Sequence, residues 1–167
     1  MKDMETKRKQ YELLCTQVES LVLGEDNIMG ILANVAAVMH DAFPSTYFWV
    51  GFYLVKDGVL QLGPFQGPVA CYRIPYGKGV CGSAWKQRRT LIIDDVEQFP
   101  GHIACSSLSR SEIVVPIIGI HSEMIGVIDI DSKELSSFDK IDQEYLEKIA
   151  AIVADFVNNL YFCASIT

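Results

Sequence analysis

Two β-hairpin signals in the middle of the chain constrain its fold more than any other feature of the sequence. An Asp-Gly dipeptide at 57–58 separates an aromatic and β-branched run at 47–55 from a second apolar run at 59–62. Asp-Gly between two such runs is typical of a tight hairpin turn. A second pair of apolar runs, 112–120 and 124–130, flanks a short polar turn. Because hairpins join antiparallel strands, we expect an antiparallel sheet in this part of the chain.

Helical periodicity surrounds these strands. Apolar residues recur every three or four positions in 11–22, in 28–39 and in 146–160, which places them on one face of a helix. Asn27 and Asp139 precede the second and third segments and are typical N-caps. Shorter elements are expected at 83–89 (helix), 70–74 (strand) and 91–93 (strand). Strands enclosed by helices predict an α+β domain, with a central antiparallel sheet flanked by N- and C-terminal helices.

Composition limits the functional classes. The chain has 167 residues and a formal net charge of −7, and a length of this order suits one domain. An acidic chain without a basic run is a poor candidate for binding nucleic acid or an anionic membrane. The longest uninterrupted apolar stretch, 113–120, is too short to cross a bilayer. Charged residues fill the first ten positions, where a secretory signal needs an apolar core. We therefore expect a cytoplasmic protein whose cysteines are thiols at rest.

The cysteines need an explanation, because a domain of this size folds without disulfides. There are five, at Cys15, Cys71, Cys81, Cys105 and Cys163. Burial as a small hydrophobic side chain is the default interpretation of any single one. No C-x-x-C pair occurs, which disfavours a thioredoxin-type dithiol and the common zinc sites. A zinc site made of Cys71, Cys81, His102 and Cys105 is an alternative, but its spacings match no common pattern, and we expect no metal.

The run GKGVCG at 77–82 matches the pattern G-x-G-x-x-G. A dinucleotide-binding fingerprint requires a buried strand before this pattern, a full helix after it and an acidic residue about 20 positions further on. Here Pro75 interrupts the preceding segment, and Asp94 and Asp95 come too early. The run therefore indicates a glycine-rich turn that brings Cys81 and the backbone close to a cavity.

Three acids mark one end of the second hairpin. Asp129 and Asp131 alternate on one strand and share a face, and Glu112 begins the strand beside them. Neighbouring carboxylates repel one another, so we expect at least one raised pKa. A solvated sheet end is the alternative, although the apolar run around Asp129 disfavours it. Trp49 and Tyr53 also share a face of their strand, either as core packing or as the lining of a small pocket.

Eight short runs carry a resemblance to a known family. They are FWVGFY (48–53), GPFQG (63–67), ACY (70–72), GVCGSA (79–84), LIIDDV (91–96), GHIAC (101–105), SRSEIV (109–114) and GVIDID (126–131). The fourth and fifth resemble a GAF domain, and together the runs resemble the free methionine-(R)-sulfoxide reductase family. The likeness spans about 10–160 of a single domain, 1–167. It implies a GAF-like fold with helices packed on one side of the sheet, and usually a homodimer.

The resemblance also implies the roles of three cysteines. Cys105 would be the nucleophile, Cys71 the principal resolving cysteine and Cys81 a third redox cysteine. Attack on the sulfur of free methionine (R)-sulfoxide would leave a sulfenic acid, which a second thiol captures as a disulfide. Thioredoxin, supplied with electrons from NADPH through thioredoxin reductase, would restore the thiols by exchange. No bound cofactor is expected.

The acids and aromatic residues receive roles from the same resemblance. Glu112, Asp129 and Asp131 would bind the sulfoxide and the amino group, and Trp49 and Tyr53 would hold the methyl-sulfinyl end. A carboxylic acid kept neutral by like-charged neighbours is suited to protonate the poor oxide leaving group. The acids would also select a ligand that carries a free ammonium group.

Two other classes of function are alternatives to an enzyme. A GAF module can sense a small ligand, but such a module normally passes its signal to an output domain, for which 167 residues leave no room. The chain can instead act as a thiol redox switch that oxidises without turning over a substrate. The combination of cysteines and acids favours catalysis.

Overall fold

A six-stranded antiparallel sheet forms the centre of the molecule. The computed structural model describes residues 2–103 and 105–164. The strands are β1 Trp49–Lys56, β2 Val59–Gln66, β3 Arg73–Pro75, β4 Leu91–Ile93, β5 Ser111–Ile118 and β6 Met124–Ser132. Their order across the sheet is β3-β2-β1-β6-β5-β4, and all neighbours are antiparallel. Both predicted hairpins, β1–β2 and β5–β6, are confirmed.

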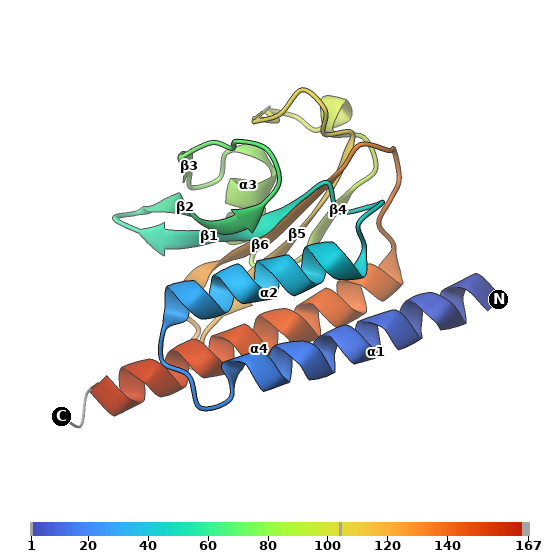
Figure 1. Cartoon of the computed structure of the whole chain (residues 1–167). Coiled ribbons are helices and arrows are strands. Elements are labelled where there is room, and N and C mark those ends of the chain that lie inside the picture. The colour runs from blue at the N-terminus through green and yellow to red at the C-terminus, as the bar shows by residue number, and fades with distance from the viewer. Residues whose placement is uncertain (1, 104, 165–167) are drawn as a thin grey trace.

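Three long helices lie on one side of this sheet, where the second and third contact the strands and the first packs on those two helices (Figure 1). They are α1 Lys2–Val22, α2 Ile28–Ala42 and α4 Lys140–Ala164. The Asn27 side chain accepts a hydrogen bond from the Gly30 N–H at 3.1 Å, and Asp139 accepts one from the Ile141 N–H at 2.7 Å. Both predicted N-caps are therefore confirmed, as is the α+β class with helices at both ends of the chain. Within the described residues, no helix is long and apolar enough to span a membrane.

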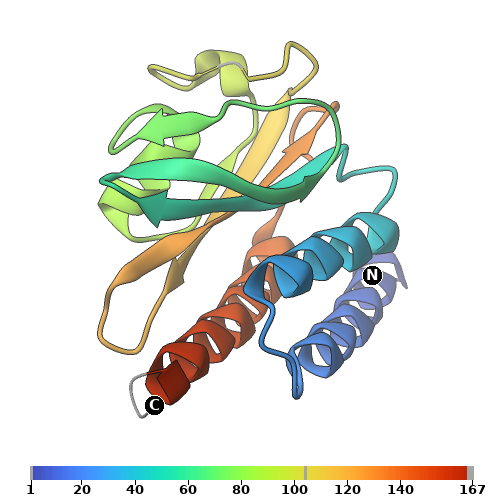
Figure 2. The same ribbon diagram turned by 60° about the vertical axis from the view of Figure 1, so that its left-hand side comes forward.

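The sheet separates two hydrophobic cores. On β1, Val50 and Phe52 belong to the core shared with the long helices, whereas Trp49 and Tyr53 belong to a cluster on the other face. The short helix α3, Gly79–Gln87, packs on β5 and β6 within this second cluster. Figure 2 shows α3 and the nearby loops on the side away from the long helices. The resemblance implies helices on one side of the sheet, and the structure adds the short helix α3 on the other side.

The second strand is longer than predicted. β2 continues through Pro64 to Gln66, whereas the prediction ended it at residue 62. β3 pairs only with residues 59–61 of β2, so the part of β2 that contains Pro64 has a free edge, where a residue without an N–H is tolerated. Conversely, the strand predicted at 70–74 is reduced to the three residues of β3, and the residues before it form a loop.

A buried polar cluster joins the helical layer to the start of β1. The Tyr11 hydroxyl donates to Asp142 Oδ1 at 2.6 Å and also contacts the Tyr47 hydroxyl, while Lys7 Nζ lies 2.6 Å from Asp142 Oδ2. Burial raises the pKa of both tyrosines well above their usual value, and the charge of Asp142 acts in the same direction. Both hydroxyls therefore stay protonated and fix α1 against α4.

Candidate functional site

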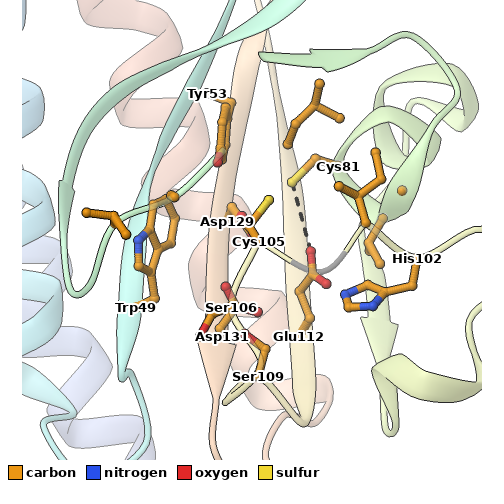
Figure 3. A pocket seen from close by; sticks show the side chains of 16 residues that line it. Trp49, Tyr53, Cys81, His102, Cys105, Ser106, Ser109, Glu112, Asp129 and Asp131 are labelled. Carbon is orange, nitrogen blue, oxygen red and sulfur yellow. Dashed lines mark hydrogen bonds between the residues drawn. The ribbon is translucent and has the colours of Figure 1, made fainter. Parts of the chain in front are cut away.

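A pocket lies on the sheet face opposite the long helices (Figure 3). Its walls come from β1, β5, β6 and the first turn of α3, and its volume is about 40 Å³. Two loops complete it, here called the Cys71 segment (residues 67–72) and the Cys105 segment (residues 99–110). The predicted site residues that line it are Trp49, Tyr53, Cys81, Cys105, Glu112, Asp129 and Asp131. The eighth, Cys71, is bonded to one of these.

The three carboxylates lie together at one end of the β5–β6 hairpin. Glu112 on β5 is the register partner of Asp131 on β6, and Val114 is the partner of Asp129. Glu112 is 5% exposed and Asp129 is 6% exposed. The proximity expected from strand alternation is confirmed, and the alternative of a solvated sheet end is wrong.

Burial and mutual repulsion change the protonation of these acids. Burial raises the pKa of Glu112 well above its usual value, and the charges of Asp129 and Asp131 raise it further. Burial and then the charge of Asp129 raise the pKa of Asp131, while a hydrogen bond from Ser109 opposes them. Burial raises the pKa of Asp129 to about 6. Asp129 is therefore the member that ionises most readily near neutral pH, whereas the raised pKa values of Glu112 and Asp131 favour their protonated forms.

One acceptor in the cluster has no partner. Among the described residues, Asp129 Oδ1 is buried without a hydrogen bond. The described residues that line the pocket include neither lysine nor arginine. A buried, ionised oxygen without a partner is costly, so this site is suited to receive a cation or a hydrogen-bond donor from a ligand.

Cys81 is a thiol that hydrogen-bonds one of these acids. Its side chain, on α3, is 3% exposed, and its Sγ donates to Glu112 Oε1 at 3.9 Å. Burial raises the pKa of the Cys81 thiol well above its usual value, and the charges of Asp129 and Glu112 act in the same direction. Cys81 is therefore a protonated thiol, which is a weak nucleophile.

A disulfide joins Cys71 to Cys105 and so connects the two loop segments across the pocket. This is the pairing that the resemblance implies. Cys81 is a free thiol. The alternative zinc site is not formed, because two of its four ligands are bonded to each other. A different group, of Cys81, Glu112 and Asp129, has its ligand atoms within 4.8 Å of one another and could geometrically hold a metal ion.

Trp49 and Tyr53 form the aromatic wall of the pocket. Their rings stack with centroids 5.9 Å apart. Gly51 lies between them on the same face of β1, and a Cβ there would come within 2.8 Å of the Trp49 ring. The glycine therefore leaves the space that this ring occupies. Core packing and pocket lining were the two alternatives for Trp49 and Tyr53, and both are confirmed, because the side chains are buried and also line the pocket.

Comparison with known proteins places the chain in one family. A family model described as a GAF domain matches residues 24–158. GAF domain-containing protein A from Dictyostelium discoideum is 54% identical over 149 residues, which cover 89% of this chain and 92% of that protein. The free methionine-R-sulfoxide reductase of Saccharomyces cerevisiae is 42% identical over 153 residues, which cover 88% of this chain and 85% of that protein.

A solved structure agrees with these relatives. The X-ray structure of free methionine-R-sulfoxide reductase from Neisseria meningitidis, in complex with its substrate, superposes with a TM-score of 0.89 at 48% identity. The match covers 95% of this chain and 93% of that one. This chain belongs to the free methionine-R-sulfoxide reductase family of GAF domains. The family and fold implied by the resemblance are therefore confirmed.

In this member of the reductase family, the glycine-rich run is a helix start. α3 begins at Gly79, four residues before the predicted position, and the Gly82 N–H donates to the Lys78 carbonyl at 3.0 Å. The sheet is antiparallel, so a dinucleotide-binding βαβ unit is excluded. The prediction that the run brings Cys81 and the backbone to a cavity is confirmed.

Two further pocket residues of this reductase family member have no predicted role in the reduction: Ser109 was not singled out, and His102 was named only in the zinc alternative. Ser109 is buried and hydrogen-bonds Asp131, and its only sequence signal is its position at the start of the run SRSEIV. His102 also lines the pocket, and partial burial lowers its pKa, which favours the neutral ring. Outside the pocket, Cys15 is partly buried against the helical core, and the side chain of Cys163 lies outside the described residues.

Proposed function

We propose that this protein reduces free L-methionine (R)-sulfoxide to L-methionine, with Cys105 as the nucleophile. The observation that carries the proposal is a linked pair of cysteines, Cys71 and Cys105, beside a pocket that contains two buried carboxylates and a third, partly buried one. Oxidisable thiols next to protonated acids are the groups that sulfoxide reduction requires. The relatives named as free methionine-R-sulfoxide reductases support the same substrate.

The first chemical step joins the cysteine to the acids. The Cys105 thiolate attacks the sulfoxide sulfur while a protonated carboxyl, Glu112, donates a proton to the sulfoxide oxygen. Its raised pKa supports this role, because a general acid must hold its proton at the working pH. The net step transfers the oxygen to Cys105. Methionine leaves, reduced by two electrons, and Cys105 carries a sulfenic acid.

The substrate is a zwitterion, and the pocket offers a site for each charge. Ionised Asp129, with its unpartnered Oδ1, and the neighbouring Asp131 bind the ammonium group. The first turn of α3 lines the pocket at Gly79 and Val80, and the N–H groups of a first helical turn suit a carboxylate. The ring faces of Trp49 and Tyr53 contact the methyl-sulfinyl end. This arrangement favours the free amino acid over a methionine residue within a protein.

Recycling of the enzyme completes the proposal. Cys71 captures the sulfenic acid as the Cys71–Cys105 disulfide, and thioredoxin reduces that bond with electrons from NADPH through thioredoxin reductase. The third redox cysteine, Cys81, keeps its proton and hydrogen-bonds Glu112. We place the protein, as a homodimer without a bound cofactor, in the cytoplasm, where thioredoxin chemistry keeps thiols reduced.

The test is a coupled assay. Thioredoxin, thioredoxin reductase and NADPH are mixed with the protein, and free methionine R-sulfoxide and S-sulfoxide are offered separately. We expect NADPH oxidation with the R form alone. No reduction of the R form with thioredoxin or any other thiol would refute the proposal. Disulfide formation without methionine release would instead support the redox-switch alternative.

Cysteine variants test the roles. Cys105→Ser should abolish even a single turnover, whereas Cys71→Ser should release one equivalent of methionine and then stall. Cys15→Ser is the matched control, because this cysteine lies on α1, away from the pocket. Retained activity in Cys105→Ser would show that the nucleophile is wrongly assigned.

A further inference from the structure

The polar ends of both aromatic pocket residues bind the loop that carries Cys71. The Tyr53 hydroxyl donates to the carbonyl oxygen of Cys71 itself at 3.0 Å. The Trp49 Nε1–H donates to the carbonyl oxygen of Pro68 at 3.0 Å. Both residues lie on the same face of β1, so one strand holds the Cys71 segment at two points.

Side-chain packing holds only part of this segment, where Ala70 and Cys71 lie partly buried against the second core. Val69 is 86% exposed and Tyr72 is 80% exposed, and Cys71 itself is only partly buried. The backbone around Cys71 is also fixed by hydrogen bonds, including one from the Leu62 N–H to the Tyr72 carbonyl at 3.0 Å. The hydrogen bond from Tyr53 is the one made to the cysteine's own carbonyl group, so it acts directly on the position of this residue.

We propose that Tyr53 is a positioning residue for Cys71, and that its hydroxyl serves the disulfide-forming step rather than contact with the sulfoxide. This inference rests on the proposed function for the identity of the reacting cysteines. In that step the Cys71 thiolate attacks the sulfur of the Cys105 sulfenic acid. The new S–S bond forms, the S–O bond breaks, and the hydroxide leaves as water with the proton that the Cys71 thiol lost when it became a thiolate.

The surroundings of the hydroxyl agree with this role. Burial, followed by the charge of Asp129, raises the pKa of Tyr53 above its usual range, so the hydroxyl remains a neutral donor. A phenol has one proton to donate, and here the Cys71 carbonyl accepts it. The face of the Tyr53 ring stays available to a ligand, whereas the hydroxyl proton is already donated to the Cys71 carbonyl oxygen. Because rates of reactions between held groups depend steeply on orientation, loss of this hydrogen bond should slow disulfide formation.

The experiment uses the fully reduced full-length protein and its Tyr53→Phe variant, which keeps the ring and removes the hydroxyl. Tyr72→Phe is the matched control, because it removes an exposed hydroxyl one residue from Cys71. In single-turnover reactions with free methionine R-sulfoxide, methionine release and disulfide formation are timed separately. A dimedone-type reagent traps the sulfenic acid. A parallel reaction with hydrogen peroxide forms the Cys105 sulfenic acid without the amino-acid substrate.

For Tyr53→Phe we expect disulfide formation to slow by roughly tenfold more than methionine release does, as loss of one hydrogen bond would give. Trapped sulfenic acid should increase in both reactions, and Tyr72→Phe should behave as wild type. Equal slowing of both steps, a raised KM with normal disulfide formation, or an unchanged disulfide rate would each overturn the inference. If methionine is never released, the proposed function fails, and the peroxide reaction still decides the role of Tyr53.

Discussion

Replacing Asp129 with asparagine should stabilise the protein at neutral pH but much less in acid. The native pKa of Asp129 is about 6, above its ordinary value of 3.8, because burial penalises the charge. The native state therefore binds this proton more tightly than the unfolded chain does. As the pH rises above 3.8 the unfolded state gains from ionisation first, so the free energy of unfolding falls until the pH exceeds 6.

The size of the effect follows from these two values. Ionisation of Asp129 costs the native state about 3 kcal/mol once the pH is above about 7, and about 1 kcal/mol at about pH 4.5. Asp129→Asn removes this cost and keeps the size of the side chain. The stability difference between variant and wild type should therefore grow by about 2 kcal/mol from about pH 4.5 to about pH 7.5. Loss of the Asp129 charge also lowers the pKa of Glu112, which acts in the same direction.

The assay is denaturant unfolding of the disulfide form at both pH values, followed by tryptophan fluorescence. Comparison across pH cancels any constant cost of placing an amide in this pocket. Asp155→Asn, at an exposed position on α4, is the control for the substitution itself. If the stability difference between Asp129→Asn and wild type is the same at both pH values, the native pKa is not raised and the reasoning fails.

Three further predictions concern substrate choice, the helical layer and the pocket wall. N-acetylation of methionine R-sulfoxide removes the ammonium charge and should lower kcat/KM by roughly 10- to 100-fold, as loss of a charge-assisted hydrogen bond would; equal kcat/KM values for the two substrates would contradict the ammonium site. Tyr11→Phe leaves a buried Asp142 oxygen without its donor and should lower the free energy of unfolding by about 1–3 kcal/mol, measured by chemical denaturation; an unchanged midpoint would count against the cluster's role. Gly51→Ala places a Cβ within 2.8 Å of the Trp49 ring and 2.4 Å of Phe65 Cβ, so it should raise KM in the coupled assay, and normal kinetics would show that the wall tolerates displacement.

The meeting of the three acids is the part of the site that follows from sequence alone. Strand alternation puts Asp129 and Asp131 on one face, and the short turn of the second hairpin sets the register that brings Glu112 beside them. These are local relations within about twenty residues, and local geometry determines them. The same reasoning predicts that Trp49 and Tyr53 share a face.

Burial and partner choice do not follow from local geometry. Whether the acids are solvated depends on α3 and the Cys105 segment, which reach this face through contacts between residues far apart in the sequence. The pairing of Cys71 with Cys105 spans 34 positions, and spacing alone leaves other pairings open, so it came from the family resemblance. The hydrogen bond from Tyr53 to Cys71 cannot be predicted from the residue types, because a backbone carbonyl in a loop accepts a hydrogen bond from any donor.

Burial of the three acids has two opposite effects: it lowers the stability of the fold, and it prepares the acids for catalysis and ligand binding. Covering the acids with α3 and two loops costs stability, because a buried carboxylate loses its hydration. The same covering favours the protonated form of Glu112 and leaves the Oδ1 atom of Asp129 without a hydrogen-bond partner among the described residues. An exposed cluster would ionise fully and could not donate a proton at neutral pH. Burial of these like-charged groups beside a reactive cysteine therefore has two consequences. It lowers the stability of the native state at the unpartnered oxygen, and it favours a ligand that carries an ammonium group.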